Sequence, residues 1–428
     1  MELCHAVLNS LALGPLLNHW SLGNGVRCVE ATMPDASLTC LDLWCRAGSS
    51  SEQHHEEGMA HFLEHMVFKG SFNLDAGVFD REIEALGGSS NAATGFDDVH
   101  FHVMIPADKA PRALDLLLDL VLEPTLAEDH FVMEREVVLE EIAQYADQPD
   151  ERVLQELLAR ACPNHAYGRP ILGWRSSLLA MDPGSMRAFH QRRYRGSNCC
   201  LSVAGKIEPD LRQSIEASAL AGLPAARDTS CEPKERPLTV ECGRHEIQVE
   251  RLESARFLML WPMAAAAMQT EVMGADLATT LLSEGRRSRL VAQLRETLRI
   301  ADTADMDLTV LEQGSLVTLE ICCQEDDLPA VEQEVKRQLD HVCDTPPEDW
   351  ELKRARQLVG NALRFALESS AQVAGLAAGQ TLWGRAQDLL QPLNELESWT
   401  TTRLQQELFP QLQAHRACTL IARPGPIS

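Results

Sequence analysis

Apolar and polar positions divide the first half of the chain into short strand-like and longer helix-like stretches. Residues 26–33 and 38–45 are rich in Val, Leu, Thr and Cys and are separated by a polar turn, as expected for two strands. Further along, apolar residues recur at helical spacing between Gly- and Pro-containing breaks. The pattern predicts helices over residues 54–68, 79–86, 107–122, 128–145, 151–161 and 183–193, a long extended segment over 91–105, and a strand over 199–204.

The second half starts again with strands and then continues with helices. The pattern predicts strands over residues 246–252, 255–261, 315–323 and 417–422, and helices over 271–282, 288–296, 328–342 and 348–368. The closing strands of the halves are similar and begin at Asn198 and Arg416, 218 residues apart. This similarity indicates a duplicated α+β unit, although two apolar strands can also match by coincidence.

Between the halves, residues 224–245 combine three prolines with many charges and are interpreted as a linker. We therefore predict an N-terminal domain over residues 1–223 and a related C-terminal domain over 246–428. A chain of 428 residues is long enough for two cores.

Charge and cysteine content exclude several classes of protein. With 38 basic and 63 acidic residues the net charge is −25, which argues against binding to nucleic acid or to an anionic membrane surface. The 13 cysteines include no Cys-x-x-Cys pair and often lie in apolar runs, as buried, reduced thiols do. No Lys or Arg precedes Arg27, and no apolar run reaches about 18 residues. We expect a cytoplasmic protein without a signal peptide or membrane span.

The strongest chemical signal is the sequence from His61 to His65. On a helix, His61 and His65 are four residues apart and project from one face, where two imidazoles can bind one divalent ion. Glu64 lies on nearly the same face and can accept a proton from an attacking water without being a ligand. The alternative interpretation is an amphipathic helix with two surface histidines.

A catalytic zinc site usually has a third protein ligand from a separate element. Within the predicted helix over 128–145, Glu134 and Glu141 are seven residues apart and share a face. Either can be the ligand, with the other orienting a histidine. Glu136 and Glu140 point elsewhere and are interpreted as solvated.

Three segments together resemble the pitrilysin-type (inverzincin) zinc metallopeptidases, peptidase family M16, which includes the mitochondrial processing peptidase and short two-domain bacterial relatives. They are Gly58 to Gly70 with its inverted His-x-x-Glu-His motif, Gly87 to Thr94, and Glu134 to Ile142. The family pattern assigns the third ligand to Glu141 and a supporting role to Glu134.

The resemblance implies two homologous domains, each a mostly antiparallel sheet layered with helices, which pair with a second chain into a clamshell. It implies a metalloendopeptidase that cleaves peptides or unfolded segments, with Zn2+ held by His61, His65 and Glu141 and with Glu64 as general base. The ligand set also suits manganese or cobalt. The peptide is expected to pair with an edge strand at Asn91, Ala92 and Thr94.

The C-terminal half departs from the family pattern at one position. Residues 285–296 resemble the family segment whose Arg, here Arg295, grips the substrate carbonyl together with a Tyr seven residues later. Asp302 stands in place of that Tyr, and an ionised carboxylate cannot donate a hydrogen bond to an oxyanion. We expect a homodimer, or a heterodimer in which a related chain supplies the Arg/Tyr pair. The alternative is a weakly active or non-catalytic assembly subunit.

His100 and His102 alternate along the predicted extended segment. They are interpreted as surface residues of a sheet rather than as metal ligands.

Overall fold

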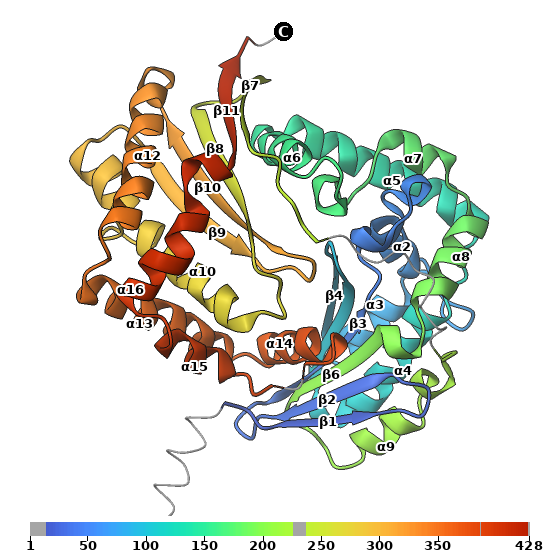
Figure 1. Ribbon diagram of the computed structural model, residues 1–428. Helices are drawn as coiled ribbons and strands as arrows, with labels where there is room; N and C mark the ends of the chain where they lie inside the picture. The colour runs from blue at the N-terminus through green and yellow to red at the C-terminus, as the bar shows by residue number, and fades with distance from the viewer. Residues whose placement is uncertain (1–13, 226–236, 386, 427–428) are drawn as a thin grey trace, which may run out of the picture. The chain divides into compact units, whose positions relative to one another are not determined.

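The computed structural model of the chain describes residues 14–225, 237–385 and 387–426 (Figure 1). These residues form two compact units that are not contiguous in sequence. Unit 1 consists of Met1–Ala143, Pro170–Pro233 and Arg364–Leu390, and unit 2 of Gln144–Arg169, Lys234–Leu363 and Gln391–Ser428.

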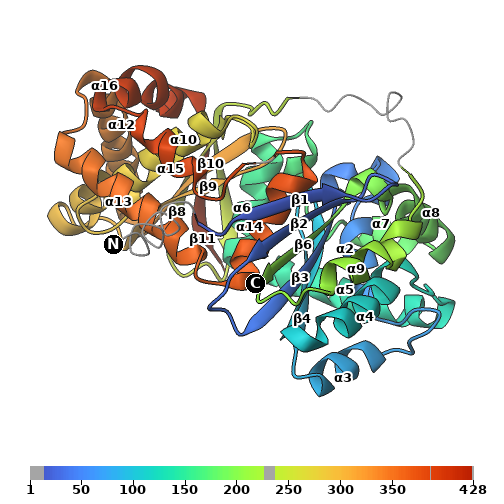
Figure 2. The same ribbon diagram turned by 90° about the horizontal axis from the view of Figure 1, so that it is seen from below.

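Unit 1 is built on a six-stranded sheet, and Figure 2 labels its strands except β5. In spatial order the strands are β1 (Leu17–Ser21), β2 (Arg27–Thr32), β6 (Cys199–Gly205), β3 (Leu38–Cys45), β5 (Val99–Pro106) and β4 (Ser89–Thr94). Only the β2–β6 pair among these is parallel, and the other neighbours are antiparallel. Strand β4 therefore lies at one edge of the sheet.

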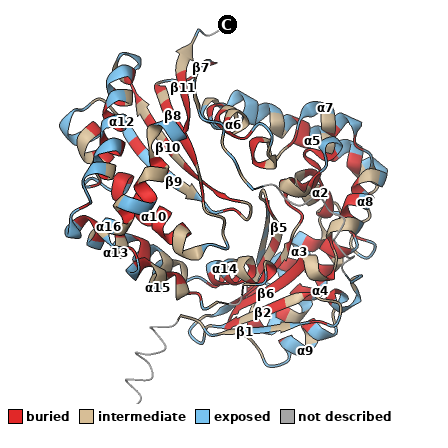
Figure 3. Cartoon of the chain, in the orientation of Figure 1, coloured by how far each residue is buried: buried red, intermediate tan, exposed pale blue. Residues whose placement is uncertain are grey.

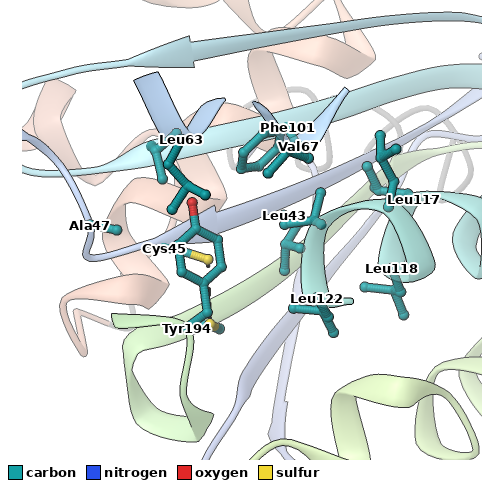
Figure 4. Close-up of a cluster of buried hydrophobic side chains, with 14 of the residues drawn as sticks. Leu43, Cys45, Ala47, Leu63, Val67, Phe101, Leu117, Leu118, Leu122 and Tyr194 are labelled. Carbon is teal, nitrogen blue, oxygen red and sulfur yellow. Dashed lines mark hydrogen bonds between the residues drawn. The ribbon is translucent and has the colours of Figure 1, made fainter. Parts of the chain in front are cut away.

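Helices of unit 1 cover the face of the sheet formed by alternate residues such as Val99, Phe101 and Val103. These helices are α2 (Met59–Val67), α3 (Val78–Ala85), α4 (Ala110–Leu122), the first part of α5 (Glu128–Asp147), α7 (Arg175–Ala180), α8 (Pro183–Arg193) and α9 (Leu211–Glu216). Figure 4 shows Leu63 and Val67 of α2 in this core near Phe101. Burial of this apolar face fixes α2 on the sheet.

Unit 2 has a five-stranded sheet of the same design. Its spatial order is β7 (Gly243–Glu250), β11 (Cys418–Gly425), β8 (Ala255–Met263), β10 (Ser315–Cys323) and β9 (Thr303–Thr309). Again one pair, β7–β11, is parallel and the rest are antiparallel. Its principal helices are α10 (Gln269–Ser283), α12 (Leu328–Asp344), α13 (Asp349–Ala366) and α15 (Gln391–Glu397).

The two units repeat one order of elements and exchange one helix. In that order α6 (Pro149–Ala161) corresponds to α14 (Ser370–Leu382), since each follows the long helix after the central hairpin. However, α6 packs on β7, β8 and β11 of unit 2, while α14 packs on β2, β3 and β6 of unit 1. The fold is thus α+β with two homologous halves. A division of the chain into contiguous domains around residues 224–245 would place α6 and α14 in the wrong units. Residues 226–236 of the predicted linker lie outside the described part.

Most predicted elements are present with small shifts of their ends, but one predicted segment has a different form and the sequence pattern does not predict β1, β9, α7, α9, α14 or α15. The extended segment predicted over 91–105 is a hairpin, because the chain turns where the Gly95 amide donates to the Asp98 carbonyl. Strand β9 was not predicted, because its exposed positions carry Thr and Asp. Helix α14 was not predicted, because its Ala- and Gly-rich sequence has a weak amphipathic pattern although seven of its thirteen residues are buried (Figure 3 colours the chain by burial).

None of the eleven cysteines that the structure describes forms a disulfide, and eight of them are buried. Burial raises the pKa of several of these thiols, to about 12 for Cys28 and Cys162. They are therefore packing residues in the thiol form. Within residues 14–225, 237–385 and 387–426, no helix is both long enough and apolar enough to span a bilayer.

Candidate metal centre

Helix α2 is fixed at its N-terminus by a buried carboxylate. Glu52 accepts hydrogen bonds from the backbone amides of Gly58, at 3.0 Å, and Ala60, at 2.7 Å. Gly58 has a φ of +94°, and a Cβ there would lie 2.6 Å from the Leu172 carbonyl oxygen, so only glycine fits this close approach. The carboxylate satisfies amide donors that a helix start leaves unpaired and sets where the helix begins.

The two faces of α2 carry different residues. Phe62, Leu63 and Met66 are at most 1 % exposed and belong to the core of unit 1. His61, Glu64 and His65 are half-buried, on the side of the helix away from that core. The helical spacing therefore produces the polar face that the sequence predicts.

Helix α5 packs beside α2 and turns two carboxylates toward it. The ring centroids of Phe62 and Phe131 lie 4.7 Å apart and join the two helices. Glu134 is buried and Glu141 is half-buried, whereas Glu136 and Glu140 are exposed, as predicted from their positions around the helix. The seven-residue spacing thus brings Glu134 and Glu141 to the histidines.

Three potential metal donors converge between α2 and α5. An oxygen of Glu141 lies 3.7 Å from Nε2 of His61 and 3.4 Å from Nε2 of His65, and the donor atoms of all three residues lie within 4.8 Å of one another. Bonds of about 2.0–2.2 Å in a tetrahedral zinc site separate neighbouring donors by roughly 3.3–3.6 Å. The His2Glu donor set therefore fits a zinc ion with little movement of side chains.

Glu134 orients one of the histidines. Its carboxylate is 3.0 Å from Nδ1 of His65 and 2.7 Å from Nζ of Lys69. A hydrogen bond from Nδ1–H directs Nε2 of His65 toward Glu141, and Lys69 balances the buried charge. In contrast, Nδ1 of His61 is buried without a hydrogen-bond partner among the described residues. Burial, and then His65, lower the pKa of His61 to about 4, so its ring is neutral at pH 7, as a metal ligand must be.

Glu64 is held beside the converging donors. The Thr94 hydroxyl on β4 donates a hydrogen bond to Glu64. Burial raises the pKa of Glu64, and this hydrogen bond partly opposes the shift. A raised pKa makes a carboxylate a stronger base near neutral pH.

The residues predicted to bind substrate lie in different places. Thr94 and Ala92 point to the α2 face of the sheet, since they pair with Val99 and Phe101, while Asn91 points to the opposite face. All three belong to the edge strand β4. Arg295 belongs to unit 2, where it is exposed on a short π-helix over Ala292–Thr297.

Asp302 is exposed in unit 2, and the structure, which describes both side chains, shows no ion pair between Asp302 and Arg295. Sequence reasoning also missed Glu52 and Lys69. Glu52 is one of several acids in a polar stretch, and nothing in its local pattern marks it as a helix cap. Lys69 lies four residues after His65 on the same helical face, a spacing that could have indicated it.

The sequence of the chain matches models of a known protein family. Residues 28–174 match the model of the insulinase family, peptidase family M16, and residues 180–359 match the model described as the peptidase M16 inactive domain. An uncharacterized zinc protease of Rickettsia felis is 25 % identical over 80 % of this chain and 82 % of its own length. The uncharacterized zinc protease YmxG of Bacillus subtilis is 32 % identical over 47 % of this chain and 49 % of its own.

Solved structures share the fold. A protease from Helicobacter pylori superposes with a TM-score of 0.88 at 21 % identity, over 96 % of this chain and all of the other. A peptidase M16 inactive domain from Pseudomonas fluorescens gives a TM-score of 0.85 at 19 % identity, over 96 % of this chain and 98 % of the other. Because both domain models of the family match, over residues 28–174 and 180–359, the chain belongs to peptidase family M16.

Proposed function

We propose that this chain is a zinc-dependent endopeptidase. The observation that carries the proposal is the convergence of His61, His65 and Glu141 next to a half-buried Glu64 that is not needed as a ligand. The curated relatives are named uncharacterized zinc proteases, and these names support the same reaction class. A purely structural metal site does not require a carboxylate in the position of Glu64.

When bound to His61, His65 and Glu141, zinc supplies Lewis-acid polarisation of the scissile carbonyl. Glu64 takes a proton from the attacking water and then delivers it to the leaving amine. Thr94 fixes the rotamer of Glu64 through its hydrogen bond. Glu134 holds His65 in the tautomer whose Nε2 has a free lone pair.

The peptide is proposed to bind along β4. This strand is at the edge of the sheet, so one side of its backbone has no neighbouring strand among the residues of unit 1 that the structure describes. An extended peptide can add there by main-chain hydrogen bonds, and Thr94 links that strand to Glu64. Backbone pairing favours unfolded segments over folded substrates.

We further propose that full activity requires a second chain. Arg295 is exposed and has no hydrogen-bonding partner among the described residues, and Asp302 replaces the expected tyrosine. A related chain that carries both Arg and Tyr would complete the grip on the substrate carbonyl. A homodimer of this chain would lack the tyrosine.

The test compares the wild-type chain with Glu64→Gln at equal zinc content, on a mixed peptide library and by mass spectrometry. We expect zinc-dependent cleavage that falls by roughly 10²–10⁴-fold in Glu64→Gln, since that is the usual contribution of a general base. Glu140→Gln, an exposed acid on α5, is the matched control and should retain activity. Equal residual rates for the wild type and Glu64→Gln, with full zinc occupancy, would favour the assembly-subunit alternative.

A further inference from the structure

A second cluster of metal-binding side chains lies in unit 1, on the sheet itself. Asp42 of β3 and His100 and His102 of β5 have donor atoms that all lie within 4.8 Å of one another. His100 and His102 are two residues apart on a strand and so share one face, and Asp42 is the direct cross-strand partner of His102. The hairpin that the sequence reading missed, together with strand pairing, creates this cluster.

The cluster lies on the opposite face of the sheet from α2. Val99, Phe101 and Val103 alternate with the two histidines and belong to the core that contains α2. The face with Asp42 is covered in part by α14, and a Cβ on Gly375 of that helix would lie 3.9 Å from Oδ2 of Asp42. The two clusters are therefore separate sites with no shared ligand.

The distances within the cluster suit a metal ion. Nδ1 of His100 forms a hydrogen bond of 3.1 Å with Oδ1 of Asp42, and this distance is also close to the separation of two donors on one zinc ion. The Asp42 side chain is 3 % exposed and that of His100 is 24 % exposed, so the cluster is buried at Asp42 and accessible at the histidines. His100 also stacks on Trp44, with ring centroids 4.6 Å apart, which limits its rotation.

Two donors of the cluster are unused by the protein. Among the described residues, the His102 ring has no hydrogen-bond partner, and Oδ2 of Asp42 has none either. One oxygen of the buried Asp42 carboxylate is hydrogen-bonded to the His100 ring and the other has no partner among the described residues, so the negative charge of Asp42 favours a cation beside it.

We propose that Asp42, His100 and His102 form a second site for a divalent transition-metal ion. Two imidazoles and one carboxylate with open positions match the preferences of ions such as Zn2+, Fe2+ and Co2+. Asn91, the exposed cross-strand partner of His102 on β4, lies on the same face and can approach the open side. The ion would tie β3 to β5, next to the edge strand β4.

The experiment uses the full-length chain, stripped with a chelator and titrated with Co2+ and with Zn2+ by calorimetry and visible spectroscopy. Four proteins are compared: the wild type, His61→Ala/His65→Ala, Asp42→Asn/His102→Gln, and the combination of all four changes. We expect two, one, one and no bound ions per chain. His415→Gln, at an exposed histidine of unit 2, is the control for nonspecific binding and should leave the count at two.

Circular dichroism of each apo protein checks the fold. Where Asp42→Asn disturbs folding, the single variant His102→Gln still tests the site, because its side chain is on the accessible side. In the His61→Ala/His65→Ala background, His102→Gln should weaken Co2+ binding by at least about 100-fold, since loss of even a supporting group costs 10–100-fold.

The proposal is overturned if His61→Ala/His65→Ala binds less than a tenth of an equivalent, or if its bound ion is unaffected by His102→Gln. If instead the proposed zinc site of His61, His65 and Glu141 is wrong, the numbers of bound ions differ from this. In that case Asp42→Asn/His102→Gln binds nothing while His61→Ala/His65→Ala still binds one ion, and the second site stands.

Discussion

The two units have corresponding helices, α2 and α10, and only α2 has a polar face with potential metal ligands. Helix α2 follows β3 in unit 1, and α10 follows β8 in unit 2. In α2, His61, Glu64 and His65 are half-buried and form a polar face. In α10, every residue from Val272 to Ser283 except Asp276 is buried. The corresponding helices therefore differ in their surroundings. Helix α2 keeps one polar face accessible, whereas α10 is buried in the core of unit 2.

Close packing explains why α10 is closed. A Cβ on Gly274 would lie 2.3 Å from the Trp399 ring, and α10 also packs against α15 and β9. In unit 1, α5 packs beside α2 and contributes carboxylates rather than an indole ring. The comparison indicates that the halves of a duplicated fold can differ in what they do because different residues cover one corresponding helix.

Removing the Glu141 carboxylate should have the largest effect on the site of unit 1. Glu141→Ala deletes one of three donors, and we expect zinc affinity to fall by at least about 100-fold, more than for loss of a supporting group. Isothermal titration measures this affinity. Glu140→Ala, an exposed neighbour, should change it little, and an equal loss in both variants would contradict the assignment of the ligand.

Removing the group that orients His65 should have a smaller effect. Glu134→Gln weakens the hydrogen bond to His65 and the ion pair with Lys69, so we expect zinc affinity to fall by about 10–100-fold. The matched control is the exposed Glu136→Gln. Unchanged affinity in Glu134→Gln would show that packing alone orients His65.

Gly274→Ala tests the closed packing of α10. The added methyl group collides with Trp399, and we expect a loss of about 1–3 kcal/mol of unfolding free energy in urea titrations. Gly379→Ala on α14 meets nothing within 4 Å and should stabilise the protein by about 0.5–1 kcal/mol. Equal effects of the two changes would mean that α10 is not tightly packed.

Asp276 gives the smallest predicted effect. Burial, and then Glu284, raise its pKa from 3.8 to about 6. Because the folded-state pKa is raised, the folded state is favoured at low pH, and this advantage is lost as pH rises from about 4 through 6. Asp276→Asn should raise Tm by roughly 2–4 °C at pH 7.5 and not at all below pH 4. A Tm change that is the same at both pH values would contradict this origin.

The sequence could predict the motif of unit 1 but not its surroundings. His61, His65, Glu134 and Glu141 follow from helical spacing, which is a local property. Asp42 is far in sequence from His102 and becomes its neighbour only through pairing of β3 with β5, so periodicity could not reveal the second cluster. The exchange of α6 and α14 depends on tertiary packing and has no local signal.

The central claim is that His61, His65 and Glu141 hold a zinc ion beside Glu64. The most direct measurement is a crystal structure with anomalous diffraction data collected on both sides of the zinc absorption edge. The account predicts an anomalous peak between Nε2 of His61, Nε2 of His65 and a Glu141 oxygen, with Glu64 outside the coordination sphere. A fully zinc-loaded crystal without a peak at this position would contradict it.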